Sequence, residues 1–167
     1  MAKLALHHRP KRALPSTLPC LFINQSCTTS LYQLTVRLEG SVAGLKRILI
    51  VEDDPMIRDM YRIVLVDKQY TVEIAGDAET AYKKVAAFKP ECILLDIMLP
   101  GVSGLEILRE LRTNPVHLCQ NVKIVILTNL AQNSVSENAI ANGADGFIIK
   151  ADILPKDLPA VIKSLED

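Results

Sequence analysis

Tryptophan is absent from the 167-residue sequence, and aromatic residues make up only 4% of it. A hydrophobic core must therefore be built from aliphatic side chains. The sequence also lacks any apolar run near the ~18 residues that a membrane-spanning helix needs. The longest run near the start, Leu18 to Asn24, is too short for the core of a signal peptide. These absences argue against a membrane-embedded or secreted protein.

The four cysteines do not have the spacing of a metal site; they are Cys20, Cys27, Cys92 and Cys119. Cys92 stands in an apolar run, where a cysteine behaves as a small hydrophobic residue. Cysteines without a disulfide framework are typical of a reducing compartment, so we expect a cytoplasmic protein.

An excess of charge of one sign is also missing, because the net charge at pH 7 is zero. Residues 1–45 hold five basic residues and one acidic residue, which leaves 14 basic and 18 acidic residues downstream. The downstream part therefore has a net charge of −4, which gives no electrostatic reason to bind nucleic acid. We do not expect DNA to be a direct partner.

Residues 1–45 are basic, contain Ser, Thr and Pro, and show no sustained periodicity. We predict a poorly ordered extension, in which Leu31 to Leu38 could form a short strand. Three explanations compete for this segment: a flexible tail, a transit-like segment, and upstream sequence translated from a misplaced start codon. Composition alone is weak evidence for targeting, so we favour the misplaced start or the tail.

Residues 46–167 show a regular alternation and are predicted to form one domain. Short apolar runs typical of buried strands occur at Ile48–Val51, Val72–Ala75, Cys92–Leu95, Ile124–Leu127 and Phe147–Ile149. Apolar residues recur at helical spacing between and after these runs, over residues 57–65, 78–85, 105–111, 135–140 and 158–165. The sequence therefore predicts a strand followed by a helix, five times over.

Capping residues support the predicted helices. Asp54 precedes Pro55, which suits an N-cap followed by proline at the first helical position, so Asp54 is a better helix cap than metal ligand. Two pairs fit the capping box, Ser103 with Glu106 and Ser134 with Glu137. Gly143 is expected to end the fourth helix.

Buried strands joined by helices imply an α/β doubly wound fold, with a parallel sheet, right-handed crossovers and helices on both faces. Ligands bind such sheets beyond the carboxyl ends of the strands. The charged and hydroxyl residues that follow the predicted strands there are Glu52, Asp53, Asp54, Asp96, Thr128 and Lys150. Crowded carboxylates repel one another, and a hard divalent cation with oxygen ligands is their natural partner. Mg²⁺, which keeps several of its waters, fits best.

A carboxylate such as Asp96 can attack phosphorus when positive charge and hydrogen-bond donors stabilise the transferring oxygens. The cation, Lys150 and the Thr128 hydroxyl are suited to this. We expect the Lys150 ammonium and the Thr128 hydroxyl to gain partners only when the phosphoryl group is attached.

Four motifs together resemble the receiver domains of two-component response regulators, the CheY-like family. They are Ile48-Leu-Ile-Val-Glu-Asp-Asp-Pro55, Cys92-Ile-Leu-Leu-Asp-Ile-Met-Leu-Pro-Gly101 with Gly104, Ile126-Leu-Thr128, and Gly143-Ala-Asp-Gly-Phe-Ile-Ile-Lys150. The resemblance covers residues 46–167 and implies a flavodoxin-like (βα)5 fold with five parallel strands in the order 2-1-3-4-5.

The resemblance also implies a role for each site residue. Asp96 would accept the phosphoryl group; Asp53 would bind Mg²⁺ directly and Glu52 mainly through water, and the main-chain carbonyl of Met98 would complete the protein ligands. Thr128 and Lys150 would bind the phosphoryl oxygens, and Phe147 would be an aromatic switch that follows Thr128.

Two positions depart from the family pattern. Proline usually follows the lysine, with a cis bond before it, but Ala151 stands there. A non-proline cis bond costs about 2.5–4 kcal/mol, so we predict a trans bond or local strain at 150–151. A small residue commonly follows the threonine, and the larger Asn129 is expected to narrow access to the phosphoryl site.

The leading hypothesis is a stand-alone receiver that a histidine kinase or phosphotransfer protein phosphorylates. It would catalyse its own phosphorylation and slow dephosphorylation without being an enzyme otherwise. Its output would pass to a partner protein or a homodimer through the fourth helix, fifth strand and fifth helix. The alternative is a constitutive adaptor with the receiver fold. A flavin protein is disfavoured because the first loop is acidic, and a phosphatase because no second acid follows Asp96 at a suitable distance.

Overall fold

A computed structural model describes residues 5–6, 45–114, 119–129 and 133–166, without the side chains of residues 5–6 and 133–136. The strands are β1 (Ala5–Leu6), β2 (Arg47–Val51), β3 (Thr71–Ala75), β4 (Cys92–Asp96), β5 (Lys123–Thr128) and β6 (Gly146–Ile149). The helices are α1 (Pro55–Asp67), α2 (Ala78–Phe88), α3 (Gly104–Thr113), α4 (Asn133–Ala141) and α5 (Leu158–Lys163). Short 3-10 turns at Lys150–Asp152 and Pro155–Asp157 join β6 to α5.

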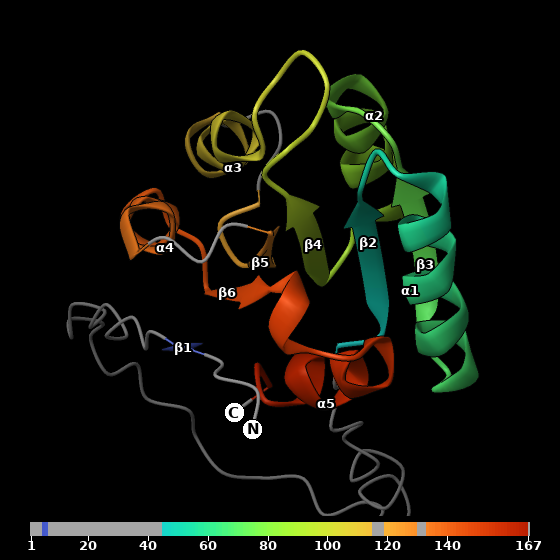
Figure 1. Ribbon diagram of the computed structural model, residues 1–167. Helices are drawn as coiled ribbons and strands as arrows, with labels where there is room; N and C mark the ends of the chain where they lie inside the picture. The colour runs from blue at the N-terminus through green and yellow to red at the C-terminus, as the bar shows by residue number, and fades with distance from the viewer. Residues whose placement is uncertain (1–4, 7–44, 115–118, 130–132, 167) are drawn as a thin grey trace, which may run out of the picture. The chain divides into compact units, whose positions relative to one another are not determined.

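Strands β2 to β6 form a parallel sheet in the spatial order β3-β2-β4-β5-β6 (Figure 1). This is the predicted order 2-1-3-4-5 when the five strands are counted from β2, so the doubly wound α/β prediction is confirmed. The two residues of β1 pair antiparallel with β6. They belong to the predicted extension, whose other residues lie almost entirely outside the described ones, as does the strand predicted at Leu31 to Leu38. The boundary between 1–45 and 46–167 stays a prediction.

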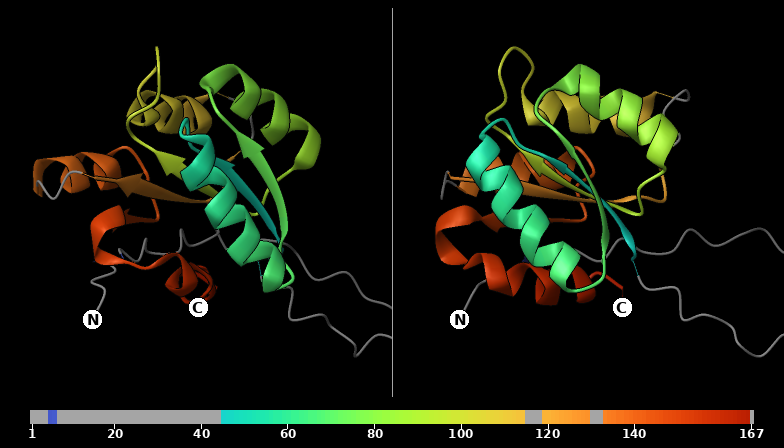
Figure 2. Two further views of the ribbon diagram at one scale, coloured as in Figure 1. Left: turned by 45° about the vertical axis from the view of Figure 1, so that its right-hand side comes forward. Right: turned by 90° about the vertical axis from the view of Figure 1, so that its right-hand side faces the viewer.

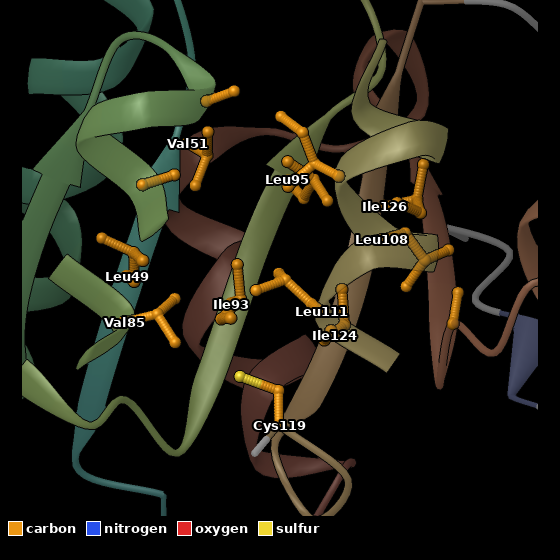
Figure 3. Packing of buried hydrophobic residues seen from close by; sticks show 14 of the residues in the cluster. Leu49, Val51, Val85, Ile93, Leu95, Leu108, Leu111, Cys119, Ile124 and Ile126 are labelled. Atoms are coloured by element: carbon orange, nitrogen blue, oxygen red, sulfur yellow. The ribbon is translucent and has the colours of Figure 1, made fainter. Parts of the chain in front are cut away.

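The side chains of the sheet alternate between two cores because successive residues of a strand point to opposite faces. Helices α2, α3 and α4 cover one face, where Leu49, Ile93 and Ile124 are buried (Figure 3). Helices α1 and α5 cover the other face, over Ile50 and Leu94, and the two helix layers lie on opposite sides of the sheet in Figure 2. As the composition predicts, both cores are largely aliphatic, and Cys92 is a buried member of the second.

The predicted helix ends are confirmed in three cases out of four. Asp54 caps α1 and accepts hydrogen bonds from the backbone N–H groups of Met56 and Ile57, and Ser103 and Glu106 form a capping box at α3. Gly143 follows α4 with a φ of +96°, a left-handed conformation that glycine adopts without strain. The prediction for Ser134 is wrong, because α4 begins at Asn133 and places Ser134 inside its first turn.

Membrane crossing finds no support in the described part of the chain, where no helix is both long and apolar enough for it.

Candidate functional site

The register of the sheet brings the predicted residues to one edge. Val51 lies beside Leu95, so that Glu52 and Asp96, the next residue of each chain segment, follow at the same level on neighbouring strands. Thr128, the last residue of β5, lies beside Ile149, and Lys150 follows directly. All four residues therefore stand at the carboxyl ends of parallel strands, as expected for a ligand site of this fold.

Three carboxylates form a cluster at this edge. Glu52, Asp53 and Asp96 each offer one oxygen, and these oxygens lie within 4.8 Å of one another. Glu52 and Asp96 are buried, with 1% and 3% of their surface exposed, whereas Asp53 is exposed. The cluster is thus open on the side of Asp53 and poorly solvated elsewhere.

Lys150 joins the two buried carboxylates. Its Nζ lies 2.6 Å from Oε2 of Glu52 and 2.8 Å from Oδ2 of Asp96, and only 7% of its side chain is exposed. The expectation that Lys150 gains partners only with a phosphoryl group is therefore wrong. The reason is that β6 places the ammonium at hydrogen-bond distance from two acids whose charge would otherwise be uncompensated.

One ammonium compensates one of the two buried negative charges. Burial raises the pKa of Glu52, the hydrogen bond from Lys150 lowers it in part, and the nearby Asp96 charge raises it further. Burial by itself lowers the pKa of Lys150, but the hydrogen bonds to Asp96 and Glu52 outweigh it, so the Lys150 pKa lies above its ordinary value. Lys150 is charged at neutral pH, and the three acids retain an excess of negative charge that suits a hard divalent cation.

The second oxygen of Asp96 is held by the loop that follows β4. The backbone N–H of Met98 donates to Oδ1 of Asp96 over 3.3 Å. Gly104 begins α3 against the main chain of Asp96, where a Cβ atom would overlap the Asp96 carbonyl oxygen. Glycine at this position lets the helix start close enough for its N–H to donate to the Ile97 carbonyl over 3.0 Å.

The remaining predicted residues surround this centre. Thr128 is buried, with 2% of its surface exposed, and Phe147 is half-buried on β6. The 150–151 peptide bond is trans, as predicted for Ala151, and Lys150 to Asp152 form a 3-10 turn. Asn129 is exposed directly after β5. Asp54 belongs to the cap of α1, as the sequence predicted.

Two residues beside the cluster were not anticipated. Arg58 on α1 donates from Nη1 to the carbonyl oxygen of Glu52 over 2.9 Å, and Gly76 lies against the same guanidinium. Helical spacing places Arg58 one turn after Asp54, but nothing in the sequence shows that this arginine turns back to the strand end.

Comparison with known proteins agrees with the geometry. A family model described as the response regulator receiver domain matches residues 48–163. The DNA-binding response regulator MtrA of Mycolicibacterium smegmatis is 34% identical over 119 residues, which cover 71% of this chain and 50% of that protein. The response regulator MprA of Mycobacterium leprae is 37% identical over 121 residues, with the same coverage of both. The chain thus spans about half the length of the curated relatives it matches.

Solved structures show the same likeness. A CheY-like receiver domain protein from Methanospirillum hungatei JF-1 superposes with a TM-score of 0.66 at 35% identity, over 74% of this chain and 95% of that one. The BeF3-activated N-terminal receiver domain of Klebsiella pneumoniae RstA superposes with a TM-score of 0.65 at 30% identity, over 72% and 98%. With the parallel sheet, the acidic cluster and the lysine at its edge, these matches show that the chain belongs to the response regulator receiver domain family of two-component systems.

Proposed function

We propose that the chain is a phosphorylation-controlled switch in which Asp96 accepts a phosphoryl group from a histidine kinase or a phosphotransfer protein. The observation that carries the proposal is the position of Asp96. It ends a central strand, is almost fully buried, and has one oxygen within 2.8 Å of the Lys150 ammonium. A carboxylate in such a place is poorly solvated and lies beside a group that can stabilise the oxygens of phosphate.

The residues present fit a magnesium ion. Glu52, Asp53 and Asp96 offer carboxylate oxygens within 4.8 Å of one another, and one ammonium leaves their charge incompletely compensated. These three side chains and the main-chain carbonyl of Met98 are the groups that would hold the ion. When bound, Mg²⁺ would add positive charge beside the transferring phosphoryl oxygens.

Asp96 would be the nucleophile of the transfer. One of its oxygens forms a bond to phosphorus while the bond from phosphorus to the donor atom breaks, and the electron pair of that bond leaves with the donor. The Lys150 ammonium, which contacts an Asp96 oxygen in the free protein, would contact a phosphoryl oxygen after the transfer. The Thr128 hydroxyl would donate a hydrogen bond to another phosphoryl oxygen. The chain would not be an enzyme beyond this transfer to itself and the slow hydrolysis of the adduct.

The switch would run from Thr128 to Phe147. Thr128 and Ile149 lie side by side in neighbouring strands, and Phe147 precedes Ile149 by two residues on the same side of β6. A movement of the Thr128 hydroxyl toward a phosphoryl group would change the space available to the Phe147 ring. The faces of α4, β6 and α5 would carry the change to a partner protein or a second copy of the chain.

The phosphodonor protein would meet the exposed face of α1. Met56, Met60, Ile63 and Val66 are exposed apolar residues at spacings of four, three and three, so they lie along one side of the helix. Met56 follows the acidic cluster within a few residues, and it is 81% exposed. A protein that delivers a phosphoryl group to the buried Asp96 must cover the end of α1 that lies beside the acidic cluster.

The stand-alone arrangement expected from the sequence stays a prediction, because the curated relatives are about twice as long and MtrA is named as DNA-binding. The alternative arrangement is a receiver joined to a DNA-binding region. The mass of the native protein distinguishes them, with at most 18.4 kDa expected for the stand-alone chain.

Incubation with Mg²⁺ and acetyl phosphate tests the proposed chemistry. One phosphoryl group is expected on the wild type, stable in acid and labile in base, and none on Asp96→Asn. Asp59→Asn is the control, because Asp59 is an exposed carboxylate on α1 paired with Arg62. An unmodified wild type, or an equal adduct on Asp96→Asn, refutes the proposal, and the former favours a constitutive adaptor. Continuous release of phosphate without an accumulated adduct would indicate a phosphatase.

A further inference from the structure

Arg58 fixes the main chain of Glu52 from the side of α1. Its Nη1 donates to the Glu52 carbonyl oxygen over 2.9 Å, while the Glu52 N–H donates to the carbonyl oxygen of Ala75 over 3.0 Å. Both polar main-chain atoms of Glu52 are therefore held, one by β3 and the other by a side chain of α1. The peptide fixed in this way joins Glu52 to Asp53, two of the three carboxylates of the cluster.

Stability alone does not explain an arginine at this position. Arg58 is half-buried, and its Nε is buried without a hydrogen-bond partner among the described residues. A buried donor without a partner costs free energy, and this cost offsets part of the stability that the hydrogen bond to the buried Glu52 carbonyl contributes. The specific consequence of the guanidinium group is the contact that it makes with the strand end.

Gly76 provides the space for this contact. A Cβ atom at Gly76 would lie 2.8 Å from Nη1 of Arg58 and 3.9 Å from the Glu52 carbonyl oxygen. The first distance is shorter than real Cβ contacts allow, and the atom that must move is the end of a flexible side chain. Alanine at this position would therefore displace the guanidinium without a large change elsewhere.

From these contacts we infer that Arg58 is a positioning residue for cation binding. It holds the Glu52–Asp53 peptide in the orientation that brings both carboxylates to the cluster. The absence of a side chain at Gly76 leaves the space that the Arg58 guanidinium occupies. The inference rests on the proposed function for the identity of the cation. Mg²⁺ requires near-ideal octahedral geometry, so a small rotation of this peptide would weaken its binding even though every ligand remains.

Magnesium titration of the full chain tests the inference, with backbone amide shifts in NMR spectra as the readout. Arg58→Met is expected to raise the Mg²⁺ dissociation constant about tenfold, the lower end of what loss of a residue that orients ligands costs. Its thermal unfolding temperature without Mg²⁺ should fall by only a few degrees, roughly the effect of one lost hydrogen bond. With acetyl phosphate, the half-saturating Mg²⁺ concentration should rise while the maximal rate at saturating Mg²⁺ stays the same. Arg62→Met is the matched control, because Arg62 lies on the same helix and pairs only with Asp59 at 3.6 Å among the ion pairs of the described residues.

Gly76→Ala provides the second variant, because it removes the contact while Arg58 remains. It should weaken Mg²⁺ binding as Arg58→Met does, and it should add nothing in the Arg58→Met background, since both changes remove the same interaction. Dissociation constants within twofold of the wild type for both variants, or additive effects in the double variant, overturn the inference. A wild type that binds Mg²⁺ and forms the adduct while both variants match Arg62→Met overturns the inference alone. A wild type that neither binds Mg²⁺ nor forms the adduct overturns the proposed function with it.

Discussion

Replacement of Lys150 by methionine removes the ammonium that joins two buried carboxylates. The two N–O distances are 2.6 and 2.8 Å. At an effective dielectric constant of about 20, each such pair attracts with roughly 6 kcal/mol before the cost of desolvation is counted. Removal of one partner from a buried ion pair costs about 3–5 kcal/mol, because the other charge is left without compensation. We expect a loss near the lower end, about 3 kcal/mol, because the cluster is open to solvent on the side of the exposed Asp53.

Urea unfolding at neutral pH, with a chelator and then with Mg²⁺, measures the effect. If a cation can replace the ammonium, Mg²⁺ at about 100 times its dissociation constant from Lys150→Met should return about 2.7 kcal/mol to that variant. The same Mg²⁺ concentration should stabilise the wild type less, because Lys150 occupies the same carboxylates there and weakens Mg²⁺ binding.

Lys84→Met is the matched control for burial. Lys84 also lies 2.6 Å from a carboxylate, that of Glu73, but the two side chains are 31% and 44% exposed. Its loss should cost less than about 1 kcal/mol. Equal stability of the wild type and Lys150→Met in the chelator, or an equal gain from Mg²⁺ in both, would refute the reasoning.

Three further changes have expected outcomes. Arg112→Met should lower the free energy of unfolding by about 3 kcal/mol, because the Arg112 side chain is almost buried and its guanidinium lies 2.6 Å from the Asp145 carboxylate. Urea unfolding measures this loss, and a loss below about 1 kcal/mol would contradict the prediction. Burial by itself raises the pKa of Glu91, but hydrogen bonds from the backbone of Arg47 and Lys46, together with the Arg47 charge, outweigh burial and lower the pKa. The Glu91 carboxylate therefore stabilises the fold at pH values above its unfolded pKa. This contribution is lost as the pH falls through the folded pKa. Glu91→Gln should therefore cost at most about 1 kcal/mol at neutral pH and nothing in acid, a difference that unfolding at several pH values would reveal or exclude. Ile63→Gln should slow transfer from a protein donor about fivefold, by loss of about 1 kcal/mol of contact energy, and leave the acetyl phosphate rate unchanged; equal slowing with both donors would place Ile63 outside the docking surface.

The architecture and the edge of the sheet that carries the site follow from the sequence, because strand and helix periods are local patterns and parallel strands end at a common edge. The sequence therefore predicts that Asp96 and Lys150 lie at the same edge. Their direct ion pair, and the pair of Lys150 with Glu52, were not predicted, because side-chain reach depends on the final register of β2, β4 and β6.

Other features depend on packing between elements that are distant in the chain. Arg58 appears in the sequence as one of several charges on α1, and only the position of that helix against the strand end shows that it contacts the Glu52 carbonyl. The prediction at Ser134 failed for a smaller reason. Several residues near the start of α4 can serve as caps, and the sequence pattern does not fix the first turn to one residue.

The strand order also determines how firmly each part of the site is anchored. Glu52 and Asp96 follow β2 and β4, each of which pairs with a parallel strand on both sides. Lys150 follows β6, which among the described residues has one parallel neighbour, β5, and on its other side only the two residues of β1. Strands at the edge of a sheet open locally at lower free energy than interior strands. Amide hydrogen exchange should therefore be faster in β6 than in β4, and each local opening releases the ammonium while the carboxylates stay in place. The interior strands β2 and β4 would thus hold the acidic half of the site more firmly than the edge strand β6 holds its cationic half.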